Sequence, residues 1–300
     1  MTIGASLARG RERLRAFGDE GRFDALRLLE DIADLSAATI FAFPERELEH
    51  AAATRYANAL ERRVAGEPIA YIVGRTGFCG RTFAVSSAVL VPRPESEALV
   101  ALTAAYVTDR SREAAPPRIC DVGTGSGALA ISIACEIPGA DIVAIDVSLE
   151  ALAVARRNAD EHGVAARVRF VRGDLLAALD AVTVSAPAFD CIVANLPYVE
   201  TAALEPAPAA TAFEPRLALD GGADGLDVYR RFLMQVPRYV RPGTLLLMEA
   251  GAATTGTLAD LAEAAFGDAA IVRTHRDYGL RERIVDVRFE PTRSLLSSRD

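Results

Sequence analysis

The side chains best suited to chemistry lie in four consecutive residues: Asn195, Leu196, Pro197 and Tyr198. They follow the apolar run Cys191 to Ala194, whose lack of polar alternation is typical of a central strand in a parallel sheet. Pro197 has no N–H, so the predicted strand ends near Asn195. An Asn side-chain oxygen and a neighbouring backbone carbonyl can together accept both hydrogens of a planar –NH2 group, on which an aromatic ring can stack. The segment therefore predicts a pocket for an amide or amino nitrogen. A strand-ending turn, in which Asn and Pro are only turn residues, remains the alternative.

A glycine-rich loop is the second candidate site. The predicted strand Arg118 to Val122 runs into this loop, and the apolar helix Ala128 to Cys135 follows it. Strand, loop and helix in this order bring the backbone close to a ligand at a helix N-terminus. The next predicted strand, Ile142 to Ile145, ends at Asp146, an acid placed to accept hydrogen bonds from ribose hydroxyls. Loop and acid together favour an adenosine-containing ligand. The loop residues are Gly123, Thr124, Gly125, Ser126 and Gly127.

The spacing of these glycines separates two kinds of adenosine ligand. Dinucleotide-binding loops have the motif G-x-G-x-x-G, whereas the loop here has the sequence G-x-G-x-G. Only one alignment of the two places a residue that the motif tolerates, Ala128, at the position of the third glycine. The looser loop suits S-adenosylmethionine, which has no pyrophosphate to place at a helix N-terminus. Asp121, just before the loop, could then face the methionine ammonium.

Two further candidates end the predicted strand Val168 to Val171, where an adenine ring would lie. Asp174 could accept a hydrogen bond from the adenine amino group, and Leu175 could cover a face of the ring. An Asp that caps a helix is an equally good interpretation of Asp174.

Composition limits the class of protein. The 300 residues suggest one large or two ordinary domains with ample core. A formal net charge of -8, with arginine supplying all 33 basic side chains, argues against a direct nucleic-acid partner. No signal-peptide pattern opens the chain and no apolar run approaches ~18 residues, so we expect a cytoplasmic protein without a membrane partner. The four cysteines form no C-x-x-C pair and are expected to be reduced and buried: Cys79, Cys120, Cys135 and Cys191.

The remaining pattern predicts helices first and then alternating strands and helices. Ala25, Leu28, Leu29 and Ile32 form one stripe of an amphipathic helix in the region up to Gly74. The connection Val199 to Leu226 is longer than compact domains usually carry without a function. Other predicted elements are a hairpin over Phe78 to Val85, a helix from Pro94, strands Phe189 to Asn195 and Thr244 to Met248, a helix through Leu258 and Phe266, and a final hairpin of Ile271-Val272 with Ile284 to Phe289 around Asp277-Tyr278-Gly279.

With these elements placed, the chain resembles the peptide chain release factor glutamine methyltransferases (the HemK/PrmC family) over nearly its whole length. The combination of Pro-Arg-Pro-Glu with an Asn-x-Pro-Tyr motif is much more specific than the glycine loop, which many methyltransferases share. The matching stretches are Glu67 to Ile72, Val91 to Glu95, Asp121 to Ala128, Asn195 to Tyr198, Phe213 to Arg216 and Asp277 to Gly279.

The resemblance implies an α/β fold in three parts: a helical domain that recognises the release factor (1–74), a β-hairpin linker (75–93), and a seven-stranded Rossmann-like S-adenosylmethionine-dependent methyltransferase domain (94–300). It implies that the glycine loop, Asp146, Leu175 and Asn195 contact the cofactor. It also implies that Asn195 to Tyr198 hold the substrate glutamine, which would be methylated on its side-chain nitrogen, N5.

One position departs from the family pattern, which usually has two prolines between Asn and Tyr. Here the first is Leu196, so the backbone carbonyl expected to act as second acceptor is present but the fixed φ of proline is lost. No obvious general base is present. Open alternatives are an adenine-N6 methyltransferase, a ribosomal-protein glutamine methyltransferase, a protein that binds cofactor or release factor without turnover, and, from the loop alone, a nucleotide-dependent dehydrogenase.

Overall fold

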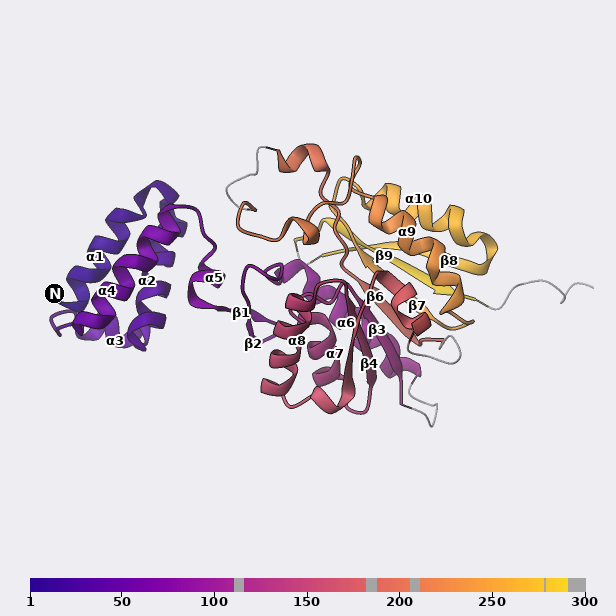
Figure 1. Cartoon of the computed structure of the whole chain (residues 1–300), viewed down its shortest axis with the longest axis horizontal. Coiled ribbons are helices and arrows are strands. Elements are labelled where there is room, and N and C mark those ends of the chain that lie inside the picture. Colours follow the sequence, from indigo (N-terminus) through magenta and orange to yellow (C-terminus); the bar gives the residue numbers. More distant parts are fainter. Residues whose placement is uncertain (111–115, 182–187, 206–210, 278, 291–300) are drawn as a thin grey trace, which may run out of the picture. The chain divides into compact units, whose positions relative to one another are not determined.

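The computed structural model describes residues 1–110, 116–181, 188–205, 211–277 and 279–290. The chain divides into two compact units (Figure 1). One comprises Met1–Arg75 with Ala207–Phe213, and the other Thr76–Pro206 with Glu214–Asp300. Tyr278 of the predicted hairpin lies outside the described residues.

The first unit is helical, as its periodicity predicts. Its helices are α1 (Ile3–Arg13), α2 (Gly18–Ala33), α3 (Ala37–Ala42), α4 (His50–Val64) and α5 (Ile69–Val73). Thr2 and Ser36 accept hydrogen bonds from the first turns of α1 and α3 and so cap them. Leu28 and Leu29 are buried in the core between the helices, where the Tyr56 hydroxyl donates to the Ala25 carbonyl oxygen at 2.9 Å.

The second unit is built on a seven-stranded sheet in the order β5-β4-β3-β6-β7-β9-β8 (Figure 1). The pairs from β5 to β7 are parallel, and β9 runs antiparallel to both β7 and β8. The predicted seven-stranded α/β fold is therefore confirmed. The strands are β3 (Arg118–Val122), β4 (Asp141–Asp146), β5 (Val168–Arg172), β6 (Cys191–Ala194), β7 (Leu245–Glu249), β8 (Ala270–Arg276) and β9 (Glu282–Phe289).

Helices cover both faces of this sheet, which explains why its central strands are apolar without alternation. Residues Ile119 and Val193 of the sheet pack with α6 (Glu97–Arg110) and α7 (Ala128–Glu136). Their neighbours in the same strands, Cys120 and Ile192, pack on the other face of the sheet with α9 (Asp227–Gln235) and α10 (Thr255–Phe266).

Helix α8 (Leu149–Glu161), capped by Ser148, and helix α9 are absent from the elements predicted above. The predicted hairpin over Phe78 to Val85 is present as β1 (Arg75–Phe78) and β2 (Arg81–Ala84), which form a separate two-stranded sheet.

All four cysteines are free thiols, but the prediction that all are buried is wrong for two of them. Cys120 and Cys191 lie inside the sheet, whereas Cys79 and Cys135 are only half-buried. In the part of the chain that the structure describes, no helix is long and apolar enough to cross a membrane.

Candidate active site

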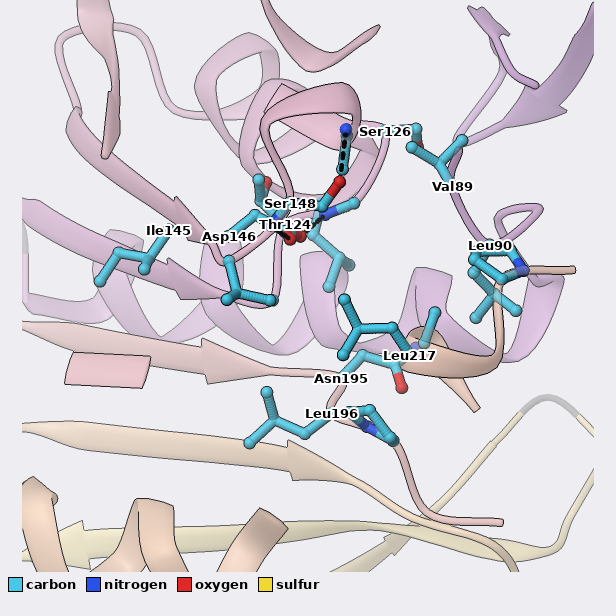
Figure 2. A pocket seen from close by; sticks show the side chains of 18 of the residues that line it. Val89, Leu90, Thr124, Ser126, Ile145, Asp146, Ser148, Asn195, Leu196 and Leu217 are labelled. Atoms are coloured by element: carbon cyan, nitrogen blue, oxygen red, sulfur yellow. Dashed lines mark hydrogen bonds between the residues drawn. The ribbon is translucent and has the colours of Figure 1, made fainter. Parts of the chain in front are cut away.

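The strand order reverses between β3 and β6, because the chain runs outward through β4 to β5 and then returns to the other side of β3. Val122 and Ala194 are partners across these two parallel strands. The residues after them, Gly123 and Asn195, therefore emerge at the same carboxyl edge, where open α/β sheets bind ligands. A cavity of ≈ 650 Å³ lies at this edge. Figure 2 shows Thr124 and Asp146 at this cavity, across from Asn195 and Leu196.

The glycine loop takes a conformation that side chains would oppose. Gly123, Gly125 and Gly127 have φ values of 78°, 55° and 80°, in the left-handed region that favours glycine. A Cβ at Gly127 would approach Ile131 Cδ1 to 2.8 Å, so this glycine serves the packing of α7. A Cβ at Gly125 would meet no atom within 4 Å. The backbone at Gly125 therefore borders open space that a ligand can fill. The cavity is lined by Thr124 and Ser126 as well as by the first two glycines.

Asp146, at the end of β4, is tied to the loop by its side chain. Its Oδ2 accepts from the Gly125 N–H at 2.8 Å and its Oδ1 from the Ser148 N–H at 2.9 Å. Burial raises the pKa of this carboxyl, while both N–H groups oppose the rise. Each carboxylate oxygen has a second lone pair, so the side chain can still accept from a ligand hydroxyl.

Asp121 lies beneath the loop rather than among the residues that line the cavity. It is fully buried, and its Oδ2 accepts from the Thr124 hydroxyl at 2.6 Å and from the Ala130 N–H at 3.2 Å. Its Oδ1 has no hydrogen-bond partner among the described residues. Burial raises the pKa of Asp121 to about 7. A contact with the methionine ammonium stays a prediction, and the unpartnered oxygen is the atom that could make it.

Asp174 and Leu175 both line the cavity, as their position after β5 predicts. The Asp174 carboxylate forms an ion pair with Arg231, a contact across 57 residues of sequence that no local pattern signals. Leu175 is buried and has a φ of 53°, which is uncommon for a residue with a branched side chain. Their proposed contacts with adenine stay predictions.

Asn195 is held by a side chain from far away in the sequence. Its Nδ2 donates to the hydroxyl oxygen of Ser96 at 3.0 Å, and Ser96 is 3 % exposed. Because Nδ2 is engaged, the amide orientation is set, and no hydrogen bond from the described residues reaches Oδ1. The side chain lines the cavity. One of the two Nδ2 hydrogens is thus used by Ser96, and Asn195 presents Oδ1 as an acceptor, which suits recognition of an –NH2 group.

The three residues after Asn195 differ in whether they line the cavity. Leu196 and Pro197 line the cavity, but Tyr198 does not. The Tyr198 hydroxyl donates to Oε1 of Glu249 at 3.4 Å. Burial and the nearby Glu249 carboxylate raise the pKa of Tyr198 to about 12, so the hydroxyl keeps its proton. Stacking of Tyr198 on a substrate stays a prediction.

Glu249 is a buried carboxylate that the sequence interpretation missed. It ends β7, is 1 % exposed, and its Oε2 has no hydrogen-bond partner among the described residues. Burial raises its pKa to about 7, with the Ser96 hydroxyl and Arg283 opposing the rise. The signal that identified Asp146, an acid directly after a buried strand, is also present at Glu249. Ser96 and Tyr229, which also contact the Asn195 segment, carry no such signal.

The long connection after Tyr198 contributes part of the cavity wall. Its residues Pro215 to Ala218 line the cavity, and Figure 2 shows Leu217 near Asn195. The buried side chain of Glu214 holds this segment in place by accepting from the Val91 N–H at 3.2 Å and from Arg93 Nη2 at 2.5 Å. The connection therefore has a structural role at the site, as its length predicts.

These residues fit S-adenosylmethionine. The open space at Gly125 admits a close backbone approach, and Asp146 has acceptor capacity left for ribose. Within the described ranges, no cluster of His, Cys, Asp or Glu could hold a metal ion. The doubly wound sheet and this edge define an S-adenosylmethionine-dependent methyltransferase.

Comparison with known proteins specifies the family. Residues 116–277 match the family model described as methyltransferase domain, and residues 5–74 match the PrmC N-terminal domain. The release factor glutamine methyltransferase of Moorella thermoacetica is 42% identical over 265 residues, which cover 88% of this chain and 90% of the relative. That of Caulobacter vibrioides is 34% identical over 291 residues, 95% of this chain and 96% of the relative. The chain belongs to the release factor glutamine methyltransferase family.

A solved structure shares the fold at low sequence identity. The catalytic domain of hMettl16, solved in complex with MAT2A 3'UTR hairpin 6, has a TM-score of 0.55 and 12% identity, and the match covers 81% of this chain and 83% of that one. This likeness concerns the fold alone.

Proposed function

We propose that this protein transfers a methyl group from S-adenosylmethionine to the side-chain amide nitrogen, N5, of a glutamine in a peptide chain release factor. The observation that carries the proposal is the fixed amide of Asn195. Its Nδ2 is bound to Ser96, which leaves Oδ1 as a free acceptor at the edge of the cofactor cavity. The names of the relatives that match nearly the whole chain support the substrate.

The chemistry requires positioning above all, because the lone pair of an amide nitrogen is delocalised into its carbonyl. The bound cofactor supplies an electrophilic methyl group on a positively charged sulfur. Oδ1 of Asn195 and the backbone carbonyl of Leu196 would accept hydrogen bonds from the two N–H groups of the substrate amide. These bonds would orient the amide nitrogen toward the methyl group. Such orientation can lower a barrier by several kcal/mol. Once the nitrogen carries the methyl group it would be far more acidic than the starting amide and would release its proton to water.

The glycine loop and Asp146 would bind the cofactor in this scheme. Gly123 to Gly127 present backbone to it, Asp146 accepts from its ribose, and Leu175 covers a face of adenine. Oδ2 of Asp174 is paired with Arg231, so a hydrogen bond from the adenine amino group would go to Oδ1.

The helical unit, about residues 1–74, would recognise the release factor, with 75–93 as linker and 94–300 as the catalytic domain. Support comes from two exposed aromatic side chains, Phe41 at 55% and Phe43 at 48% exposure. Arg11 and Arg46 lie over their rings, at 5.8 Å and 5.9 Å from the centroids. Aromatic side chains are enriched at protein–protein interfaces relative to the rest of the protein surface. The net charge of -8 supports a protein rather than a nucleic acid as partner.

Incubation with labelled S-adenosylmethionine and purified release factor, followed by mass spectrometry of the peptides, tests the function. We expect one methyl group on a glutamine side chain. Free adenine-containing nucleic acid and ribosomal proteins serve as competing substrates. Methylation of either of those, with none on the release factor, would refute the proposal.

A further inference from the structure

One buried hydroxyl, that of Tyr229, joins the carboxyl ends of β6 and β7 behind the active site. Tyr229 comes from α9 and its side chain is fully buried. Its oxygen accepts from the Leu196 N–H at 3.2 Å. The hydroxyl also lies 3.3 Å from the carbonyl oxygen of Ala194 and hydrogen-bonds the carbonyl of Glu249. Three backbone groups from two strand ends therefore meet at one side chain.

The two peptide groups next to the hydroxyl at β6 are those on either side of Asn195. The Ala194 carbonyl precedes this residue and the Leu196 N–H follows it, so the hydroxyl lies beside the backbone on both sides of Asn195. Its single proton goes to the nearer carbonyl, that of Glu249, so its hydrogen bond to the Asn195 segment is the one that it accepts from the Leu196 N–H. The side chain of Asn195 is held separately, by Ser96. Main chain and side chain of the proposed substrate-binding residue thus have independent anchors.

The Leu196 N–H needs this partner. Leu196 is 4 % exposed, and a buried N–H without an acceptor carries a desolvation penalty. A leucine also has a free φ, so without the hydrogen bond the 195–196 peptide plane could rotate relative to the 196–197 plane, which contains the Leu196 carbonyl, and the direction of that carbonyl would no longer be fixed. Proline at this position would have no N–H and a fixed φ, and would need no such acceptor.

The side chain of Leu196 adds a link to the cofactor loop. A Cβ built at Gly123 would lie 3.0 Å from Leu196 Cδ2, so the leucine packs directly against the first glycine of the loop. The position of the 195–196 peptide therefore affects both the substrate acceptors and the loop.

We propose that Tyr229 is a positioning residue for methyl transfer: by accepting the Leu196 N–H it fixes the 195–196 peptide plane, from which the φ angle of Leu196 sets the direction of the Leu196 carbonyl that, together with Asn195 Oδ1, holds the substrate amide. This inference rests on the proposed function. The hydroxyl touches neither substrate nor cofactor and acts through the backbone.

A double-mutant cycle of Tyr229→Phe and Leu196→Pro tests the proposal, because proline removes the N–H that the hydroxyl accepts. We expect Tyr229→Phe alone to lower the single-turnover rate on release factor by up to about tenfold, the upper end of the range for one neutral hydrogen bond. In the Leu196→Pro background the same change should lower the rate by less than about threefold, since the coupled interaction is already gone. Cofactor affinity by calorimetry should differ by less than about twofold between each Tyr229→Phe protein and its parent with the same residue at position 196, which shows that the loss of the hydroxyl leaves the cofactor site folded.

Tyr239→Phe is the matched control. Tyr239 is 1 % exposed and its hydroxyl donates to Asp180 at 2.7 Å, so the variant also loses a buried tyrosine hydroxyl. It should lower the unfolding temperature without changing the rate. An equal loss of rate from Tyr229→Phe in both backgrounds, or no loss in either, would overturn the proposal.

Hydrogen exchange of the Leu196 amide, followed by NMR with labelled leucine, gives a readout that does not depend on turnover. Exchange should accelerate in Tyr229→Phe and stay unchanged in Tyr239→Phe. Unchanged exchange in Tyr229→Phe would contradict the hydrogen bond itself. If the wild-type protein methylates no release factor, the proposed function fails, and the exchange rates still decide whether Tyr229 holds the peptide.

Discussion

Replacement of Asn195 is the most direct test of how the substrate amide is held. Asn195→Ala removes the Oδ1 acceptor and also leaves the buried Ser96 hydroxyl without the Nδ2 donor that it has at 3.0 Å. Loss of one preorganised contact to a reacting group typically costs ~2.7–4 kcal/mol of barrier, or about a hundred- to a thousand-fold in rate.

The structure separates the loss of the acceptor from the loss of its orientation. Ser96→Ala leaves Oδ1 in place and removes the anchor that keeps Nδ2 away from the substrate, together with the hydrogen bond of the Ser96 hydroxyl to Glu249. One neutral hydrogen bond contributes ~0.5–1.5 kcal/mol, so the rate should fall by roughly two- to tenfold. Asn195→Asp keeps the shape but puts a charge beside the substrate amide and the Ser96 hydroxyl, and its rate should lie below that of Ser96→Ala.

Single-turnover methylation of the release factor by the three variants measures these rates. Calorimetry with S-adenosylmethionine is the control, because the glycine loop and Asp146 remain and the affinity should change little. If Asn195→Ala transfers methyl groups at nearly the wild-type rate, Asn195 is only the residue that ends the strand. If Ser96→Ala is as slow as Asn195→Ala, the orientation of the side chain matters more than its oxygen.

Three further predictions concern the cofactor, the pH dependence of stability and the partner. Asp146→Ala should weaken cofactor binding by roughly 1.5–3 kcal/mol, the value of hydrogen bonds to a charged group, and unchanged affinity in calorimetry would remove Asp146 from the ribose site. Burial raises the pKa of Glu249 from 4.5 to about 7, so between these values the folded protein binds more protons than the unfolded chain, and the stability from this group falls as pH rises. Glutamine does not titrate, so the unfolding temperature of Glu249→Gln minus that of the wild type should rise by several degrees between about pH 5 and pH 8. A difference that stays constant over this range would show that Glu249 does not titrate there. Changing Phe41 and Phe43 together to serine should raise KM for intact release factor, with cofactor affinity unchanged, and an unaltered KM would place the recognition surface elsewhere.

Much of the second unit could be predicted because its sequence signals are local. The strands β3, β4 and β7 lie within a few residues of their predicted limits, and their interiors are apolar except for Asp121 in β3, as expected for strands covered on both faces. The glycine loop is equally local, since a run of positive φ values needs glycine at particular positions. The helix α9 begins directly after the long connection, with Leu226 at its N-cap and no side-chain cap hydrogen bond, and the prediction omitted it.

The sequence by itself thus determined the type of fold, the loop that faces the cofactor and the residue types that can hold an amide nitrogen. Only the tertiary structure decided which side chains hold those residues in place. Ser96 is 99 positions from Asn195, Tyr229 is 33 from Leu196, and Glu214 is 121 from Arg93. Such pairs form because strand order and register bring distant segments to one edge of the sheet. Local periodicity depends on neighbours within a turn or a strand and carries no information about that order.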